Sequence, residues 1–430
     1  MAVVNTLLQV ALDLADLERA IKIAEEAVEG GADWLEVGTP LIKSEGMNAV
    51  REFKKRFPSK VIVADMKTMD TGAFETELAC KSGADVVSVL AVADDGTIRE
   101  AVLAAKRFGA RIAVDLIGCT NPVVRAVECA KLGAEIIYAH AGIDQQMKGI
   151  TSLAIAKELA GRTSAIIGVV GGLNPENIAE AARYGNLVVV GGAITKAPDA
   201  AAATRLLKSA IASGRKVKSD LYKKYGEKDL LKAFLKVSTP NISDAMHHEG
   251  QMRGIRNLFG LKFAGPALTV RTYNGDWAKP VEALERAEPG TVIVIDAQGG
   301  DVAVWGELAT NSAVVKKLAG IVIDGATRDV DEIRKLRFPV CSRHIASSCG
   351  DPKGWGEIGP EIVCGGVRVN TGDWIVGDEN GIVVVPKEKA VEIANRALDV
   401  FERENRIRAE IRKGKTLSEV AYLKKWEKVG

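Results

Sequence analysis

The feature that most constrains the fold of this chain is a phrase repeated through its first half. In each copy an alanine-rich stretch ends at a glycine, and a β-branched run follows at once. A glycine there is typical of the left-handed residue that ends a helix, so each copy predicts a helix followed by a buried strand. The copies read A-V-E-G-G-A-D-W-L-E-V, A-C-K-S-G-A-D-V-V-S-V, A-A-K-R-F-G-A-R-I-A-V, C-A-K-L-G-A-E-I-I-Y-A and A-A-R-Y-G-N-L-V-V-V, with glycines at Gly31, Gly83, Gly109, Gly133 and Gly185.

The spacing of the copies predicts the number of strands. Adjacent copies are about 25 residues apart, and two gaps are about twice that length. Apolar runs at 61–64 and 165–169 fill those gaps, and Leu7–Leu12 precedes the first copy. Eight strand–helix units predict a (β/α)8 TIM barrel. The rival is an open doubly wound sheet, which favours a G-x-G-x-x-G after the first strand, and that motif is absent here.

Polar side chains stand where five of these predicted strands end. A TIM barrel carries its catalytic groups at the carboxyl ends of its strands. The alternative for each of these residues is a polar group of the core with its hydrogen bonds satisfied. For Asp115 this alternative and a catalytic role have equal weight. For His140 taken alone the alternative is preferred. Five such strands on one face nevertheless favour a catalytic site. In chain order the residues are Asp13, Glu36, Asp65, Lys67, Asp115 and His140.

The third strand is the most informative. Asp65 and Lys67 are two residues apart, so on an extended strand their side chains point to the same face. Asp70 follows where the strand gives way to a loop. Two carboxylates and an ammonium at the end of a buried strand are costly unless they pair or hold a metal.

Two glycine pairs predict a phosphate site. Gly171-Gly172 follows the seventh strand and Gly191-Gly192 follows the eighth. Barrels of this kind hold phosphate there on backbone N–H groups and a helix N-terminus. We expect the next helices to begin at Asn174-Pro175 and at Thr195.

The first half resembles 3-hexulose-6-phosphate synthase, in the orotidine-monophosphate-decarboxylase superfamily. The resemblance covers residues 1–212 and rests on Q-V-A-L-D, E-V-G-T-P-L-I, D-M-K-T-M-D, H-A-G-I-D and V-V-G-G-A-I-T. It implies condensation of formaldehyde with ribulose 5-phosphate, and the reverse reaction, through an enediolate held by Mg2+ or Mn2+. The alternative is a sister decarboxylase of a 3-keto sugar-acid phosphate. Those enzymes have an arginine where this chain has Gly192, which favours the synthase.

The resemblance also implies a role for each site residue. Glu36 and Asp65 match the metal-binding carboxylates, and Lys67 matches the lysine beside the enediolate. His140 matches the histidine that transfers protons, and Asp13 matches an aspartate that contacts the substrate.

Asp70 matches an aspartate that family members extend across a dimer interface into the partner's site. The resemblance therefore implies a homo-oligomer in which two barrels share their sites. For the second domain, assembly into a trimer stays an open alternative.

The composition of the chain limits the classes of protein to which it can belong. A chain of 430 residues exceeds one average domain, and its net charge of +2 gives no pull toward nucleic acid or membrane surfaces. Six cysteines without a C-x-x-C pair indicate reduced thiols. The amino end lacks the basic start of a secretory signal, and no apolar run reaches the length of a membrane span. We therefore expect a cytoplasmic protein.

The repeat stops near residue 212, and a charged stretch follows. We expect the barrel at 1–212, a linker at 213–229 and a second domain at 230–430. Few helices separate the strands expected in that domain, which predicts a compact α/β fold with a mixed sheet. Its charged tail is expected to lie on a partner subunit. The expected strands are 268–272, 292–296, 320–324, 339–342, 362–363, 374–377 and 382–386.

The second domain carries its own chemical cluster in G-E-L-A-T-N-S-A and G-I-V-I-D-G-A-T-R-D. Together with V-S-T-P-N-I-S-D-A-M and G-D-W-I-V-G-D-E-N-G-I-V-V-V-P, it resembles the family of the regulator of ribonuclease activity A and the class II 4-hydroxy-4-methyl-2-oxoglutarate aldolases over 230–410. By match, Arg328 holds a pyruvate carboxylate, Asp329 a divalent metal and Glu307 a metal-bound water. Catalysis on 2-oxo acids and binding of a ribonuclease both stay open.

Overall fold

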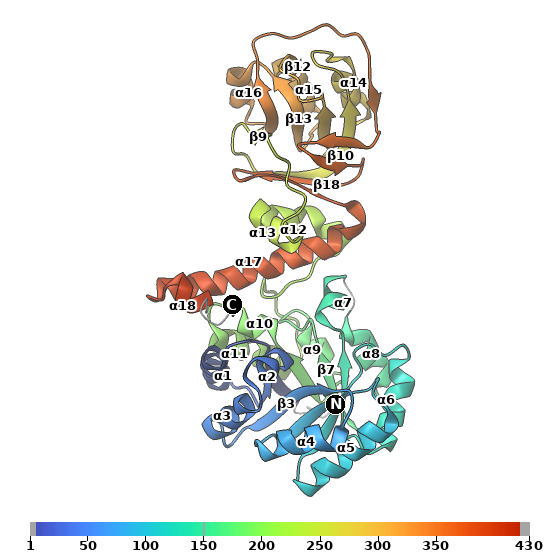
Figure 1. The fold of residues 1–430 in the computed structure, drawn as a ribbon, viewed down its shortest axis with the longest axis vertical. Coiled ribbons are helices and arrows are strands. Elements are labelled where there is room, and N and C mark those ends of the chain that lie inside the picture. The colour runs from blue at the N-terminus through green and yellow to red at the C-terminus, as the bar shows by residue number, and fades with distance from the viewer. Residues whose placement is uncertain (1–5, 149–150, 422–430) are drawn as a thin grey trace, which may run out of the picture. The chain divides into compact units, whose positions relative to one another are not determined.

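A computed structural model describes residues 6–148 and 151–421, and the chain divides into two compact units (Figure 1). One unit joins Met1–Lys224 to Glu402–Gly430, and the other is Tyr225–Phe401. These limits differ from the expected domains at 1–212 and 230–430. The segment after the barrel stays with the barrel as far as Lys224, and the chain returns to the same unit at Glu402.

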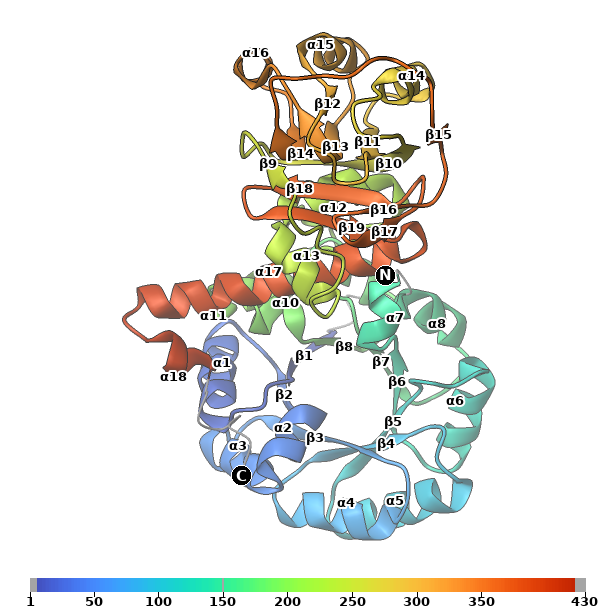
Figure 2. The ribbon, with the colours of Figure 1, turned by 45° about the horizontal axis from the view of Figure 1, so that its top comes forward.

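In the first unit, eight parallel strands close into a barrel in chain order, which confirms the predicted fold. Figure 2 shows them as a ring enclosed by helices. Buried apolar runs of four to eight residues make each strand, since both of its faces are covered. The strands are β1 (Leu7–Leu12), β2 (Trp34–Val37), β3 (Val61–Thr68), β4 (Val86–Leu90), β5 (Arg111–Asp115), β6 (Ile136–His140), β7 (Ile166–Val170) and β8 (Leu187–Val190).

Helices connect the strands, and glycines end most of them as predicted. Gly31, Gly83, Gly109 and Gly133 have positive φ. Gly185 is not among the positive-φ glycines; there a Cβ would lie 2.7 Å from the side chain of Val169, so close packing explains it. The helices are α1 (Leu17–Glu29), α2 (Thr39–Glu45), α3 (Asn48–Arg56), α4 (Gly72–Lys81), α5 (Asp95–Arg107), α6 (Pro122–Lys131), α7 (Ile143–Met147), α8 (Ser152–Leu159), α9 (Ile178–Ala181), α10 (Gly192–Thr195) and α11 (Ala200–Ser213).

Two apolar layers support the barrel. Strand β1 illustrates them, because Leu8, Val10 and Leu12 pack outward against the helices while Ala11 joins the layer inside the barrel. This alternation is the period of two that a strand imposes. The inner layer fills the barrel with residues such as Trp34 and leaves the carboxyl ends of the strands to polar side chains.

The second unit is built on a mixed sheet in the order β19-β18-β10-β11-β13-β14-β9, with β12 on β13 and β15 on β10. Helices α14 to α16 gather on one face of it (Figure 1). The bounds are β9 (Arg256–Asn257), β10 (Phe263–Arg271), β11 (Val292–Asp296), β12 (Ala303–Trp305), β13 (Gly320–Thr327), β14 (Val340–Ile345), β15 (Glu357–Ile358), β16 (Ile362–Cys364), β17 (Val367–Val369), β18 (Trp374–Asp378), β19 (Gly381–Val385), α12 (Leu230–Lys236), α13 (Thr239–Ala245), α14 (Ala278–Arg286), α15 (Glu307–Val315) and α16 (Val330–Leu336).

The charged tail forms α17 (Ala390–Arg412) and α18 (Leu417–Ala421). Its last part packs within its own chain, which corrects the expectation that it needs a partner subunit. Arg406 is buried and donates to Glu26 on α1 at 3.1 Å and to the carbonyl oxygen of Ala197 at 3.0 Å. Glu410 accepts from Arg406 and Arg19. These charges tolerate burial because they pair with one another.

All six cysteines are free in the structure, and their reduced state stays a prediction. Among the described residues, none of the helices combines the length and the apolar character that a bilayer crossing requires.

Candidate active site

A cavity of about 560 Å³ opens where the barrel strands end. It brings together every predicted barrel residue except Asp70. Because the strands are parallel and in register, their carboxyl ends meet at one mouth. The predicted residues that line it are Asp13, Glu36, Asp65, Lys67, Asp115, His140, Gly171, Gly172, Gly191 and Gly192.

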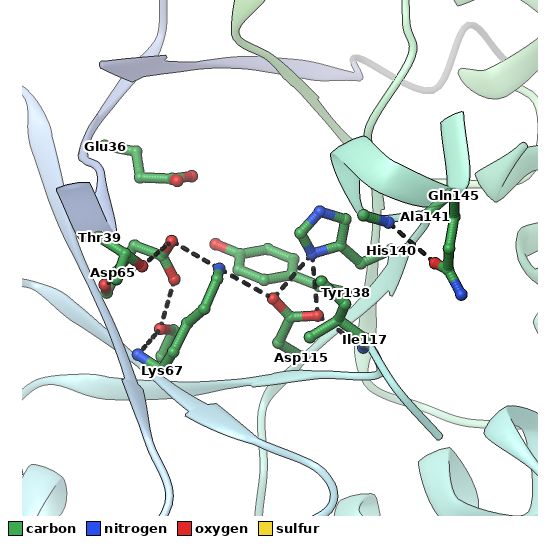
Figure 3. Close-up of polar contacts among 12 residues, drawn as sticks. Glu36, Thr39, Asp65, Lys67, Asp115, Ile117, Tyr138, His140, Ala141 and Gln145 are labelled. Atoms are coloured by element: carbon green, nitrogen blue, oxygen red, sulfur yellow. Dashed lines mark hydrogen bonds and ion pairs between the residues drawn. The ribbon is translucent and has the colours of Figure 1, made fainter. Parts of the chain in front are cut away.

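Four of these side chains form a continuous polar chain (Figure 3). Nζ of Lys67 lies 2.7 Å from Oδ2 of Asp65 and 3.2 Å from Oδ2 of Asp115. Nδ1 of His140 lies 2.8 Å from the same Asp115 oxygen. A backbone donor, the N–H of Ile117, completes the partners of Asp115 at 2.9 Å. The lysine thus lies between two carboxylates, one of which also holds the histidine.

Within this group of four polar side chains, the opposite charges stabilise one another. Burial alone lowers the pKa of Lys67, but the Asp65 and Asp115 carboxylates raise it more, so the ammonium persists. Burial raises the pKa of Asp115, but His140 and Lys67 lower it more. The Asp115 carboxylate therefore accepts the Nδ1 proton of His140, and in that tautomer of imidazole Nε2 is the nitrogen that can accept a proton.

A distortion of strand β3 positions the lysine. The pairing of β3 with β4 shifts register between Ala64 and Thr68, and Lys67 has a φ of +47°. The N–H of Lys67 donates to Oγ of Ser88 at 3.0 Å, and that hydroxyl donates to Asp65 at 2.7 Å. The predicted contact of Asp65 with Lys67 exists, but the strand is kinked rather than regular. A non-glycine residue at positive φ stores strain of the kind found at functional sites.

Three carboxylates crowd one side of the cavity. Ligand oxygens of Asp13, Glu36 and Asp65 all lie within 4.8 Å of one another. Burial, followed by the Asp65 and Asp13 carboxylates, raises the pKa of Glu36 well above its usual value. Burial and then Asp65 raise the pKa of Asp13. Oxygen ligands and mutual repulsion both suit a divalent cation such as Mg2+, so the group fits the metal that the resemblance implies, with Asp13 added to the set.

Three further residues were missed in the sequence: Gln9 and Thr39 hold carboxylates directly, and Tyr138 holds Gln9. Gln9 donates to Glu36 and lies 3.1 Å from the hydroxyl of Tyr138. Thr39 donates to Oδ2 of Asp65 at 2.7 Å. Tyr138 had a signal, because it precedes His140 by two on one strand and so shares its face. Thr39 lies within the E-V-G-T-P-L-I motif, and Gln9 had only its place in Q-V-A-L-D.

The two glycine pairs line the other side of the cavity. Gly171 has a φ of +99°, and a Cβ there would overlap the carbonyl oxygen of Ala141. The helix starts differ from expectation. Helix α9 begins at Ile178, four residues after the expected start at Asn174. Helix α10 ends at Thr195 instead of beginning there. The first glycine pair therefore lies in a loop, and the second lies at the start of α10, whose N-cap is Gly191.

Asp70 lies apart from the cavity. Its side chain is exposed and accepts from the N–H of Thr71 at 2.7 Å. Within one chain it therefore contacts none of the other site residues that line the cavity, and its entry into a partner's site stays a prediction.

The second unit brings its three predicted residues together in a separate cavity of about 260 Å³. Nε of Arg328 lies 3.4 Å from Oδ2 of Asp329, and the N–H of Glu307 lies 3.3 Å from the same oxygen. Asp329 has a φ of +56°, again a strained residue at a predicted site. Cys349, which the sequence motifs did not include, lies 2.9 Å from Nη1 of Arg328.

Fold and site together define a TIM-barrel enzyme with an appended α/β unit. Residues 6–207 match the orotidine 5′-phosphate decarboxylase / HUMPS family, and residues 239–384 match the RraA-like family, described as aldolase/RraA. Through its barrel the chain belongs to the orotidine 5′-phosphate decarboxylase / HUMPS family. Both resemblances predicted from the sequence are confirmed.

Similar proteins narrow the class. The 3-hexulose-6-phosphate synthase of Mycobacterium gastri is 43% identical over 209 residues, which are 48% of this chain and 99% of that protein. The synthase of Methylomonas aminofaciens is 40% identical over 46% of this chain and 95% of its own length. A crystal structure of 3-hexulose-6-phosphate synthase is 40% identical over 48% of this chain and 100% of that chain, with a TM-score of 0.45. The synthases establish the predicted class of the barrel, a carbon–carbon lyase.

Proposed function

We propose that the barrel condenses formaldehyde with ribulose 5-phosphate to 3-hexulose 6-phosphate, and catalyses the reverse cleavage. The observation that carries the proposal is the polar chain in which Lys67 lies between Asp65 and Asp115 while His140 is held on Asp115. An aldol reaction of this type needs a base for a carbon-bound proton and positive charge beside the oxygens that become negative.

The side chains supply these requirements. Nε2 of His140 is the acceptor for the proton on carbon 1 of the ketose. The resulting carbon attacks the carbon of formaldehyde, and the formaldehyde oxygen takes up a proton as the new bond forms. Lys67 donates hydrogen bonds to the negative oxygens, since its paired carboxylates keep it charged. A divalent cation held by Asp13, Glu36 and Asp65 would add Lewis-acid stabilisation.

The glycine loops suit the phosphate of the substrate. Gly171-Gly172 and Gly191-Gly192 line the same cavity as the polar chain. Backbone N–H groups bind phosphate without a charged side chain. The substrate would then lie with its phosphate at the glycines and its carbonyl at Lys67.

The test is an assay of the full chain with ribulose 5-phosphate, formaldehyde and Mg2+ or Mn2+, following formaldehyde loss and hexulose phosphate formation. Asp65→Asn should lower kcat by at least about 10²-fold, and EDTA should stop turnover. Asp85→Asn is the control, because Asp85 caps the opposite end of the strands and pairs with Lys54. Carbon dioxide release from a 3-keto sugar-acid phosphate without formaldehyde uptake would overturn the proposal in favour of a decarboxylase.

For the second unit we propose a site for a 2-oxo acid and a divalent metal. The supporting observation is the cavity shared by Arg328, Asp329 and Glu307. A guanidinium presents a planar fork to a carboxylate, and an adjacent carboxylate can hold Mg2+. The competing function, binding of a ribonuclease, needs no such pair. Barrel dimers, a trimer of the second unit and a cytoplasmic location remain parts of this proposal.

A further inference from the structure

One residue of the cavity wall comes from outside the barrel repeat. Tyr222 lies beyond residues 6–207 that match the family, in the charged segment that the sequence presented as a linker. It lines the same cavity as the two glycine pairs, and the residue is only 6% exposed. The apolar core of the barrel includes its ring.

Side-chain contacts fix the ring at the glycine side of the cavity. A Cβ on Gly192 would overlap the ring of Tyr222, so glycine at this position and the tyrosine fit together. The tyrosine hydroxyl lies 3.5 Å from Oε1 of Gln146, which also lines the cavity. Nε2 of Gln146 is held on the carbonyl oxygen of Ala141 at 2.7 Å. At 3.5 Å this contact is at the long limit of a hydrogen bond.

Backbone contacts hold the residue in an unusual conformation. Tyr222 has a φ of +51°, a region that side chains with a Cβ rarely adopt. Its N–H donates to Oε1 of Glu402 at 3.0 Å, and its carbonyl oxygen accepts from Nδ2 of Asn174 at 3.2 Å. A strained backbone conformation persists only where several surrounding contacts hold it in place. Such residues cluster at binding sites.

Positive charge surrounds this ring. Nζ of Lys224 lies 4.3 Å from the ring centroid and Nζ of Lys196 lies 5.2 Å from it. Both ammonium groups are close enough for cation–π attraction. Neither lysine lines the cavity itself, but both add positive charge behind the ring that does.

We propose that Tyr222 is a specificity-determining residue that closes the phosphate side of the cavity. Its ring forms the wall over Gly192, and its hydroxyl donates to a phosphate oxygen of the substrate. The inference rests on the proposed function for the identity of the substrate. It adds that phosphate recognition in this chain depends on residues after the barrel, so a barrel cut at residue 212 would lack it.

The experiment compares Tyr222→Phe and Tyr222→Ala in the full chain. The alanine variant should raise KM for ribulose 5-phosphate at least about tenfold, and the phenylalanine variant by a smaller factor of about two to five, which is the loss of one hydrogen bond. KM for formaldehyde should not change, because formaldehyde reacts away from the phosphate. Lys223→Met is the matched control, since its ammonium pairs with Glu176 at 3.1 Å and does not line the cavity.

A binding measurement separates this inference from the proposed reaction. Calorimetry with inorganic phosphate and with ribulose 5-phosphate requires no turnover. Because the ring is part of the core, the alanine variant is expected to melt at a lower temperature, so the phenylalanine variant decides. Binding of ribulose 5-phosphate weakened about two- to fivefold in Tyr222→Phe, at an unchanged melting temperature, supports the role even if no condensation is seen. Unchanged binding overturns it, as does absence of phosphate binding by the unaltered chain. An equal loss in Lys223→Met would assign the effect to charge and also overturn it.

Discussion

Oδ2 of Asp115 lies 2.8 Å from Nδ1 of His140 and 3.2 Å from Nζ of Lys67. One buried carboxylate oxygen therefore faces both the histidine that we propose as proton acceptor and the lysine that we propose as hydrogen-bond donor to the substrate. It fixes the imidazole tautomer and keeps the lysine charged. We therefore propose that Asp115 is a positioning residue of the site. The sequence had weighed such a role evenly against that of a core polar residue with its hydrogen bonds satisfied.

The first prediction concerns Asp115→Asn. The amide would donate where the carboxylate accepts, so His140 would adopt the other tautomer and Lys67 would lose an anion. We expect kcat to fall by about 10²- to 10⁴-fold with little change in KM, and the pH dependence of kcat to shift. Steady-state kinetics between pH 6 and 9 would test this. Asp33→Asn, which removes a carboxylate that pairs with Lys208, is the control; a loss of less than threefold in kcat would contradict the role.

The second prediction is that barrels share their sites through Asp70. Asp70→Ala and Lys67→Ala chains should each be inactive. After mixing under conditions that exchange subunits, hybrid dimers would contain one intact site, giving up to about one quarter of normal activity. Each variant treated alone provides the control. Exchange proved by differently tagged chains, with no activity regained, would refute a shared site.

The third prediction is a pH effect in the second unit. Asp276 is buried and accepts backbone N–H donors from Ala278 at 3.0 Å and from Lys353 and Trp355 at 3.1 and 2.9 Å. Burial raises its pKa, but these donors lower it more, so the net shift is downward. A carboxyl whose pKa is lower in the folded state stabilises above its unfolded pKa of about 3.9, and that stabilisation is lost as the pH falls through the folded value.

Asp276→Asn should therefore make the 353–355 loop open more easily at pH 7, by about 1–2 kcal/mol. Amide exchange of that loop in the full chain, corrected for intrinsic rates, measures the change. At pH 3 the difference from the unaltered chain should shrink. Asp301→Asn, at an exposed position, should leave exchange unchanged. A difference that is equal at both pH values would disprove the electrostatic origin.

The fourth prediction addresses catalysis by the second unit. The full chain with Mg2+ and oxaloacetate or 4-hydroxy-4-methyl-2-oxoglutarate should form pyruvate. Asp329→Ala should abolish it, and Arg328→Lys should lower it at least about tenfold, because an ammonium lacks the guanidinium fork. Asp65→Asn should keep this activity, which separates the two units. No pyruvate, with no metal-dependent binding of oxalate, would leave the unit as an interaction module.

Local patterns made the barrel predictable. Helix ends at glycines and buried β-branched runs depend on neighbours in sequence, so the strands begin where the pattern placed them, as at Leu7, Trp34 and Val61. Because parallel strands then close in order, polar residues at their ends met in one cavity without further information. This argument predicted Asp65, Lys67 and His140 as residues at the mouth of the barrel.

Contacts distant in sequence were not predictable. The kink at Lys67 depends on the register between β3 and β4 and on Ser88. Tyr222 appeared to be part of a charged linker, because nothing in its neighbourhood reveals the approach to Gly192. The charges of the tail suggested a helix that lies on a partner subunit, because burial of Arg406 depends on its pairing with Glu26, nearly four hundred residues earlier.

The return of the chain to the first unit at Glu402 affects the order of events during synthesis. Tyr222 leaves the ribosome about 180 residues before Glu402, roughly 10–40 s earlier at ordinary elongation rates. The barrel strands can therefore pair while the carboxylate that accepts from Tyr222, and the Arg406 that joins Glu26, do not yet exist. A premature stop anywhere in the second unit would release a barrel in which Tyr222 lacks its contact with Glu402.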